Sequence, residues 1–252
     1  MRYFIELCYN GKNYHGWQIQ PAALSVQETI EKALTVLLRE KIQVVGCGRT
    51  DAGVHASQFF LHFDSEVEFE SEKLKFQLNS ILPDDIAIFE VLKVKDSAHA
   101  RFDAMSRSYE YKIFEGKNPF LLETHYQVTE FDVDLNKMNE AADLLIKYSD
   151  FKCFSRTKTD VKTFICSIEE ARWEKQGDVW IFYIRANRFL RNMVRAIVGT
   201  LIEVGQNKRT LEQFKEVIES RDRSEAGPSA KARGLHLTRI EYPKEIFIDA
   251  YV

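Results

Sequence analysis

The sequence lacks any long hydrophobic run. No apolar stretch approaches the roughly 20 residues that a bilayer-spanning helix needs, although hydrophobic residues make up 45% of the chain. The first residues, MRYFIELCYNG, become polar too early for a secretory signal peptide. We therefore expect a cytoplasmic globular protein with an ample core and no membrane partner.

Cysteine is scarce, and its spacing fits no known framework. The sequence contains neither a C-x-x-C pair nor a histidine at zinc-finger spacing from a cysteine, and its four cysteines are Cys8, Cys47, Cys153 and Cys166. Widely spaced cysteines in a cytosolic protein are typical of reduced thiols. We therefore expect neither disulfides nor a structural metal.

Glycine-rich phosphate loops are also missing. Gly46 and Gly48 have the first spacing of the G-x-G-x-x-G pattern, but the third glycine position is occupied by Asp51, and no G-K-[ST] triplet is present. The sequence therefore predicts no nucleotide cofactor, and we expect none of any other kind.

The chain has no excess of positive charge. Its formal net charge is −3, with a pI near 6.1. This balance argues against a protein that coats nucleic acid indiscriminately, but a local basic groove remains compatible with it, because phosphate binding depends on where the cations lie.

Hydrophobic periodicity in the first 100 residues predicts the order strand, helix, strand, strand, helix, strand. Ser25 and Glu28 have the spacing of a capping box at the start of the first helix. The expected strands are 2–9, 41–45, 57–64 and 86–94, and the expected helices are 26–40 and 72–82. This is the order of a ferredoxin-like unit, whose open sheet face is used by many RNA-binding modules.

The second half has a similar pattern. The expected strands are 106–116, 164–174, 179–186 and 234–242, and the expected helices are 135–146, 189–204 and 211–220. We therefore predict an α+β fold of two ferredoxin-like halves, 1–100 and 101–252, with antiparallel sheets that face a central cleft. Such a cleft is a natural ligand site.

The segment GCGRTDAGVHA, residues 46–56, has an unusual composition for a turn between two strands. One interpretation is a hairpin in which Asp51 caps its own backbone. The other is a presented carboxylate, because Arg49 could keep Asp51 ionised and positioned as a nucleophile or general base.

Tyr109 and Tyr111 alternate along a predicted strand and therefore share one face. They could fill the core or the sheet face. Together with the nearby Arg101 and Arg107, they could also stack on a base and contact phosphate.

Three arginines fall within the predicted helix 189–204 or at its start. Arg188, Arg191 and Arg195 have the spacing i, i+3 and i+7, which places them on one helix face. That face could be merely solvated, or it could bind RNA phosphates, since no acidic residue lies among them. Arg195, next to the apolar stripe, could instead turn inward toward a carboxylate.

Seven segments, in this order, resemble the tRNA pseudouridine synthase A family: YNGKNYHGWQIQ, SVQETIEKAL, GRTDAGVHA, LNSILPDDI, HARFDAMSRSYEYKI, FLRNMVRAIVG and GLHL. The resemblance spans nearly the whole chain. It implies that Asp51 is the catalytic aspartate, paired with Arg195, and that Tyr109 stacks on the target uracil. It also implies that Arg49 enters the space left by the flipped nucleotide and that Leu235 lines the uracil pocket.

The resemblance further implies the reaction and the partner. The reaction would be the isomerisation of uridine to pseudouridine at positions 38, 39 and 40 of the tRNA anticodon arm, by a homodimer that acts on tRNA and not on DNA. An ionised aspartate could attack C1′, add to the uracil ring or take a sugar proton, and the sequence does not choose among these routes. Two alternatives remain: a non-catalytic RNA-binding module, and a synthase that acts on another RNA position.

Three positions depart from the family's usual pattern. Ser57 stands where glycine is common, Cys166 where arginine is frequent and Lys231 where proline is frequent. None belongs to the implied catalytic set, so these departures bear on loops and on fine substrate preference.

Overall fold

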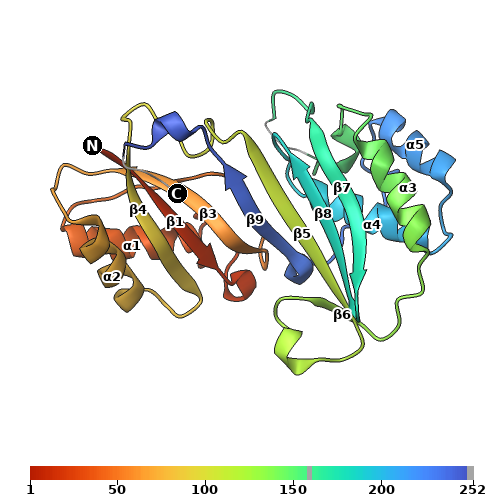
Figure 1. Cartoon of the computed structure of the whole chain (residues 1–252), viewed down its shortest axis with the longest axis horizontal. Coiled ribbons are helices and arrows are strands. Elements are labelled where there is room, and N and C mark those ends of the chain that lie inside the picture. The colour runs from red at the N-terminus through yellow and green to blue at the C-terminus, as the bar shows by residue number, and fades with distance from the viewer. Residues whose placement is uncertain (158–160, 249–252) are drawn as a thin grey trace. The chain divides into compact units, whose positions relative to one another are not determined.

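The computed structural model describes residues 1–157 and 161–248. Its contacts divide the chain into two compact units (Figure 1). The N-terminal unit comprises Met1–Ser106 together with the described residues from Leu237 onward, and the C-terminal unit comprises Arg107–His236.

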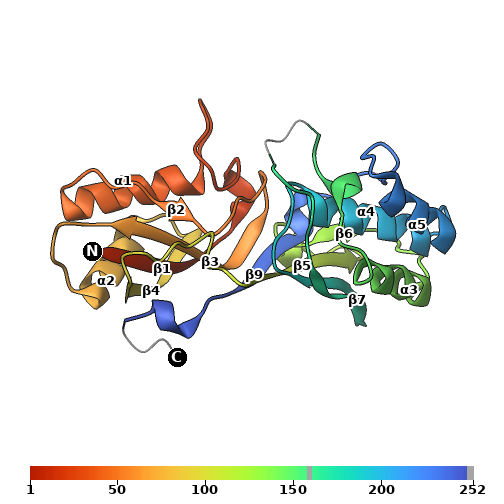
Figure 2. The same cartoon turned by 90° about the horizontal axis from the view of Figure 1, so that it is seen from above.

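The N-terminal unit has the predicted order of elements. They are β1 (Arg2–Tyr9), η1 (Gly11–Asn13), α1 (Val26–Leu38), β2 (Val45–Gly46), β3 (His55–Asp64), α2 (Ser71–Ile81) and β4 (Ile86–Val94), followed at the end of the chain by β9 (Leu235–Glu241) and η5 (Lys244–Ile246). β1 pairs antiparallel with both β3 and β4, β2 pairs with β3, and β9 is the next neighbour of β3. α2 packs against β4 and α1, and α1 lies along the strands (Figure 2).

The C-terminal unit is built around a mixed sheet. Its elements are β5 (Ser106–Glu115), η2 (Pro119–Leu121), β6 (Tyr126–Val128), α3 (Leu135–Leu145), η3 (Lys152–Phe154), β7 (Ile168–Gln176), β8 (Val179–Ala186), α4 (Met193–Gly205), α5 (Leu211–Ser220) and η4 (Ala232–Gly234). β8 pairs antiparallel with β5 and β7, whereas the short β6 pairs parallel to β5. α3 packs against β7, α4 and α5 (Figure 1).

The predicted strand 41–45 is wrong over most of its length, because only Val45–Gly46 pair as a strand. Side chains of α1 satisfy the backbone of the preceding residues instead. Thr35 Oγ1 accepts from the Ile42 amide at 3.2 Å, and Glu31 Oε1 accepts from the Val44 amide at 2.9 Å. Ile42 and Val44 are buried nonetheless, so their alternating hydrophobicity reflects packing without strand pairing.

The predicted helix 189–204 begins four residues late, at Met193. Asn192 precedes it with φ 65°, a left-handed conformation that breaks the helical backbone and that asparagine tolerates better than most residues. The three arginines therefore do not share one helix face, since Arg188 and Arg191 come before the helix and only Arg195 lies within it. The strand predicted to start at 164 likewise starts later, at Ile168.

The two units do not follow the predicted division at residue 100. The residues from Leu237 onward, which were predicted to belong to the second half, group with the N-terminal unit. The Ile240 amide donates to Gln58 Oε1 at 2.8 Å, and the Met105 amide donates to the Glu241 carbonyl at 2.8 Å. After β9, the Lys95 amide donates to the Ile246 carbonyl at 2.9 Å. The closing segment is thus attached to the first unit by these two backbone–backbone hydrogen bonds and by the one to the Gln58 side chain.

His62 is a buried titratable residue in β3, with 4% of its surface exposed. Its Nδ1 accepts from the Ala100 amide at 3.1 Å, so the imidazole is unprotonated at that atom. Burial, with contributions from Arg2 and His99, lowers the pKa of His62 to about 4. The unfolded chain therefore binds a proton near pH 6.5 that the folded protein excludes until about pH 4.

We expect His62 to make the protein less stable as the pH falls through this window. Between pH 7 and pH 5 its contribution to the free energy of unfolding falls by up to about 2 kcal/mol. Urea denaturation of His62→Asn, which keeps an acceptor near the Nδ1 position, should show a correspondingly smaller loss between the two pH values. His15→Gln, at an exposed histidine, is the control. An equal pH dependence in all three proteins would contradict the assignment.

Among the helices in the described part of the chain, none combines the length and the apolar character required of a transmembrane span.

Candidate functional site

The loop between β2 and β3 carries Asp51 and has a defined shape. The Cys47 amide donates to the Phe60 carbonyl at 2.7 Å, which anchors the start of the loop to β3. The Val54 amide donates to the Asp51 carbonyl at 3.1 Å and closes a four-residue turn, with Gly53 at φ 75°. Asp51 is therefore the first residue of a tight turn.

A second segment, residues 9–17, supports this loop on both sides of Asp51. The Trp17 amide donates to the Thr50 carbonyl at 3.3 Å, and the Gly53 amide donates to the Tyr14 carbonyl at 3.2 Å. The Thr50 hydroxyl is hydrogen-bonded to the Tyr9 hydroxyl at 2.8 Å. The backbone position of Asp51 is thus fixed by the residues that flank it.

Two glycines permit this close approach. Gly16 has φ 91°, and a Cβ atom there would lie 2.3 Å from the Thr50 carbonyl oxygen. A Cβ at Gly46 would lie 2.6 Å from the indole of Trp17, which stacks on Phe59 with ring centroids 4.1 Å apart. These glycines serve internal packing, whereas a Cβ at Gly48 would meet no atom within 4 Å.

The side chains of the loop alternate in burial. Thr50 is buried, whereas Asp51 is partly exposed and Arg49 is exposed. The anchor is therefore turned inward, while the two residues with candidate roles retain contact with solvent.

Tyr14, which is not among the predicted site residues, has a defined polar contact. Its hydroxyl donates to Asp85 Oδ1 at 2.5 Å, and Asn13 Nδ2 donates to Asp85 Oδ2 at 3.1 Å. Burial and the Asp85 carboxylate raise the pKa of Tyr14, so it remains a donor. Tyr14 and Asp85 both lie in quoted family segments, and this was the only signal in the sequence for this contact.

In the C-terminal unit, Tyr109 and Tyr111 have different environments although they share a strand face. Tyr109 pairs with Ile184 of β8, is partly exposed, and makes a T-shaped contact with the Phe189 ring at a centroid distance of 5.0 Å. Tyr111 is fully buried, and its hydroxyl donates to the Lys231 carbonyl at 2.9 Å. Tyr111 is therefore a core residue, and Tyr109 is the candidate for stacking.

Leu235 directly follows η4 and is buried, with 6% of its surface exposed. The residue before it, Gly234, lies close against Tyr111, because a Cβ there would lie 2.8 Å from the Tyr111 ring. Lys231, at the start of η4, has φ −62°, the angle that a proline ring enforces. The departure from proline at this position thus leaves the backbone unchanged.

The candidate RNA-contact arginines lie at the connection from β8 to α4 or contact it. Arg107 Nη1 donates to the Asn187 carbonyl at 2.9 Å, next to Arg188. The Arg156 amide donates to the Arg191 carbonyl at 3.0 Å, and Arg191 is exposed. Arg188 and Arg191 lie in the irregular segment between β8 and α4. Arg156, which was not among the predicted residues, is a neighbour of this segment.

The other two departures from the family pattern are accommodated locally. Cys166 is fully buried, and burial raises the pKa of its thiol to about 11, so it is a neutral packing residue. Ser57 is exposed, and its hydroxyl donates to the Leu237 carbonyl at 3.4 Å.

The candidate residues are divided between the units. Arg49 and Asp51 belong to the N-terminal unit, and the C-terminal unit holds Arg107, Tyr109, Arg188, Arg191, Arg195 and Leu235. Within the described residues, no group of three histidine, cysteine or acidic side chains is arranged to hold a metal.

The comparisons with known proteins agree with the motifs. A family model described as tRNA pseudouridine synthase matches residues 8–103 and 141–243. The tRNA pseudouridine synthase A of Bacteroides thetaiotaomicron is 52% identical over 249 residues, which cover 98% of this chain and 92% of the relative. That of Bacillus subtilis is 38% identical over 245 residues, covering 96% of this chain and 99% of the relative. The chain therefore belongs to the tRNA pseudouridine synthase family, a family of isomerases.

Proposed function

We propose that this protein converts uridine to pseudouridine at positions 38, 39 and 40 in the anticodon arm of tRNA. Family membership and the names of the relatives support tRNA as the substrate. The observation that carries the proposal is the Asp51 turn, braced on both flanks by residues 9–17 while the aspartate side chain remains partly exposed. A turn that served only to connect two strands would not need this support.

The reaction is an isomerisation, and this determines what the protein must supply. The C1′–N1 bond breaks, the freed uracil turns, and C5 bonds to C1′ while the C5 proton is released and N1 gains one. Product and substrate have the same composition, so no oxidant or group donor is consumed. The protein must extrude the base, at a cost of a few kcal/mol, and hold it while it turns.

We assign the steps to the candidate residues as follows. Asp51 acts in its ionised form on the sugar or the uracil ring, as a nucleophile or as a base, and Arg195 pairs with it. Tyr109 stacks on the uracil, and Leu235 supplies an apolar wall. Arg49 occupies the space that the flipped nucleotide leaves. Stacking and phosphate contacts offset the cost of extrusion.

We further propose the assembly that the family resemblance implies. Two ferredoxin-like halves form the chain, a homodimer is the active species, and the cytoplasm is its location. Concentrating arginines such as Arg107, Arg188 and Arg191 near one connection provides cations for RNA phosphates in a chain whose net charge is −3.

Tritium release tests the function. The wild-type protein is incubated with a tRNA transcript whose uridines carry tritium at C5, and released tritium is counted while modified sites are mapped. We expect release from tRNA with uridines at 38, 39 or 40, and none when all three are replaced. Binding without release would favour the non-catalytic RNA-binding module, and release from the replaced tRNA would favour another target position.

For the arginines, we expect Arg191→Glu to weaken tRNA binding and to reduce its salt dependence. Loss of one phosphate contact lowers the slope of log affinity against log salt by about 1. Filter binding across a salt series measures both quantities. Lys147→Glu, at an exposed position in the same unit, makes the same charge change as a control. If the two variants weaken binding equally, Arg191 has no specific role.

A further inference from the structure

The segment 223–230 packs directly on the middle of α4. A Cβ at Gly199 would lie 1.7 Å from the Pro228 carbonyl oxygen, so the two backbones are in contact. The Gly227 amide donates to Thr200 Oγ1 at 3.0 Å. The shape of this segment therefore bears on the helix that carries Arg195.

Arg223 folds this segment into a compact turn. Its Nη1 donates to the carbonyls of Ala226 at 3.2 Å and Gly227 at 3.1 Å, and its Nη2 donates to Ser229 Oγ at 2.9 Å. One planar guanidinium thus joins three acceptors, a geometry that lysine cannot reproduce.

Ser229 connects the turn held by Arg223 to the start of α4. Its hydroxyl also accepts from Asn192 Nδ2 at 2.6 Å. Asn192 is the left-handed residue that precedes the helix, and its own carbonyl accepts from the Ala196 amide at 3.1 Å. An unusual backbone conformation is therefore held by a side-chain contact from the turn.

Ala230 holds Arg195 at two points. Arg195 Nε donates to the Ala230 carbonyl at 2.7 Å, and the Ala230 amide donates to the Arg195 carbonyl at 2.9 Å. Both the backbone and the guanidinium of Arg195 are thereby tied to the residue that follows Ser229. The direction of the Arg195 side chain depends on the turn that Arg223 shapes.

We infer that Arg223 and Ser229 are positioning residues for Arg195, acting through Asn192 and Ala230. This inference rests on the proposed function, because it assumes that Arg195 takes part in the reaction. Neither residue need touch RNA: the turn sets the orientation of the arginine that is proposed to pair with Asp51.

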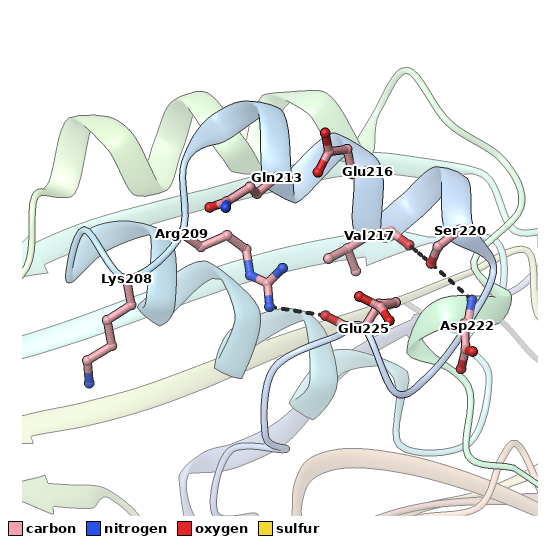
Figure 3. Close-up of a pocket in the computed structure, with 8 residues that line it drawn as sticks. All are labelled: Lys208, Arg209, Gln213, Glu216, Val217, Ser220, Asp222 and Glu225. Carbon is pink, nitrogen blue, oxygen red and sulfur yellow. Dashed lines mark hydrogen bonds between the residues drawn. The ribbon is translucent and has the colours of Figure 1, made fainter.

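The other end of the segment has its own support. Arg209 Nη2 donates to the Glu225 carbonyl at 3.0 Å, beside a surface pocket of about 550 Å³ under α5 (Figure 3). Arg209 also pairs with Glu203 of α4 at 3.1 Å. Because this support is independent of Arg223, loss of the Ser229 hydroxyl should disturb the start of α4 without releasing the whole segment.

Ser229→Ala is the decisive variant, and Ser229→Thr, which keeps the hydroxyl, is its rescue. We expect Ser229→Ala to lower kcat for pseudouridine formation by about 30-fold while KM for tRNA changes less than about threefold, the pattern of a group used in the reaction step. Ser229→Thr should lie within about threefold of the wild type. Ser224→Ala, on the same segment, should match the wild type. Arg223→Ala should lower kcat similarly, and the double variant should lose little more, because the two act through one contact.

A second measurement does not require activity. The Arg195 Nε–H signal in a ¹⁵N spectrum should exchange slowly with solvent in the wild type and in Ser229→Thr, and rapidly in Ser229→Ala. An unchanged signal, or a kcat for Ser229→Ala equal to that of the wild type, would overturn the inference. A loss of kcat that threonine does not restore would also overturn it. A wild type that forms no pseudouridine would instead refute the proposed function, and the spectrum would still decide the positioning role.

Discussion

Asp51→Asn will reduce pseudouridine formation by about three orders of magnitude, while tRNA affinity stays within about threefold of the wild type. An amide is a much weaker nucleophile than a carboxylate toward C1′ or C6, and it cannot accept a sugar proton. All three chemical routes therefore require the carboxylate. The described anchors of the turn are backbone groups and the Thr50 hydroxyl. The substitution therefore leaves these anchors in place. Tritium release and filter binding measure the two effects.

Asp84→Asn is the matched control, since Asp84 is an exposed aspartate of the same unit. It should leave both activity and affinity unchanged. If Asp51→Asn kept more than about a tenth of the wild-type rate, removal of the carboxylate would cost less than a catalytic acid or base typically supplies. The turn would then be a structural element whose aspartate caps the backbone.

Gly16→Ala should lower both stability and activity, although Gly16 is not itself a candidate site residue. Its Cβ would lie 2.3 Å from the Thr50 carbonyl oxygen, and its φ of 91° is unfavourable for any side chain. The left-handed backbone alone costs about 1–2 kcal/mol, and relief of the clash requires the turn to move. We expect a fall of several degrees in melting temperature and a loss of activity of at least about 30-fold, because a small misplacement of a reacting group is costly.

Gly48→Ala separates the two roles that a glycine in this loop can have. A Cβ there meets no atom of the chain within 4 Å, so the melting temperature should not change. Weaker tRNA binding by Gly48→Ala would then report contact between the loop backbone and RNA.

Equal stability and activity for Gly16→Ala and the wild type would show that the Asp51 turn does not depend on residues 9–17.

Elements with strong local signals were predictable from the sequence. β8 has the predicted bounds, because β-branched and aromatic residues follow the turn at Gly177. α5 does as well: Thr210 precedes it and forms a capping box with Gln213, and the left-handed Arg221 follows its last residue. In both elements, the residues that set the ends are close in sequence to the element itself.

The predictions failed where distant groups determine the backbone. Residues 41–44 alternate in hydrophobicity like a strand, but the amides of residues 42 and 44 donate to the side chains of Thr35 and Glu31 in α1 and not to another strand. Asn192 is held in its left-handed conformation by a contact to Ser229, which no local pattern reveals. Tertiary hydrogen bonds outweighed local preference in both segments.

The candidate site shows the same limit. The resemblance selected Asp51 and Tyr109, because motif residues can be carried over one by one. The support of the Asp51 turn by Tyr9, Tyr14 and Trp17 is a contact between separate segments of the chain and appears only in the folded unit. Spacing within a motif does not encode such contacts.

The placement of β9 has a consequence for synthesis on the ribosome. One neighbour of β3, the strand β9, is encoded after almost all of the C-terminal unit. While the nascent chain emerges, the N-terminal unit therefore keeps one sheet edge uncovered until the C-terminal unit and β9 have been synthesised. An uncovered strand edge can pair with other chains, so the N-terminal unit is exposed to misassociation during this interval.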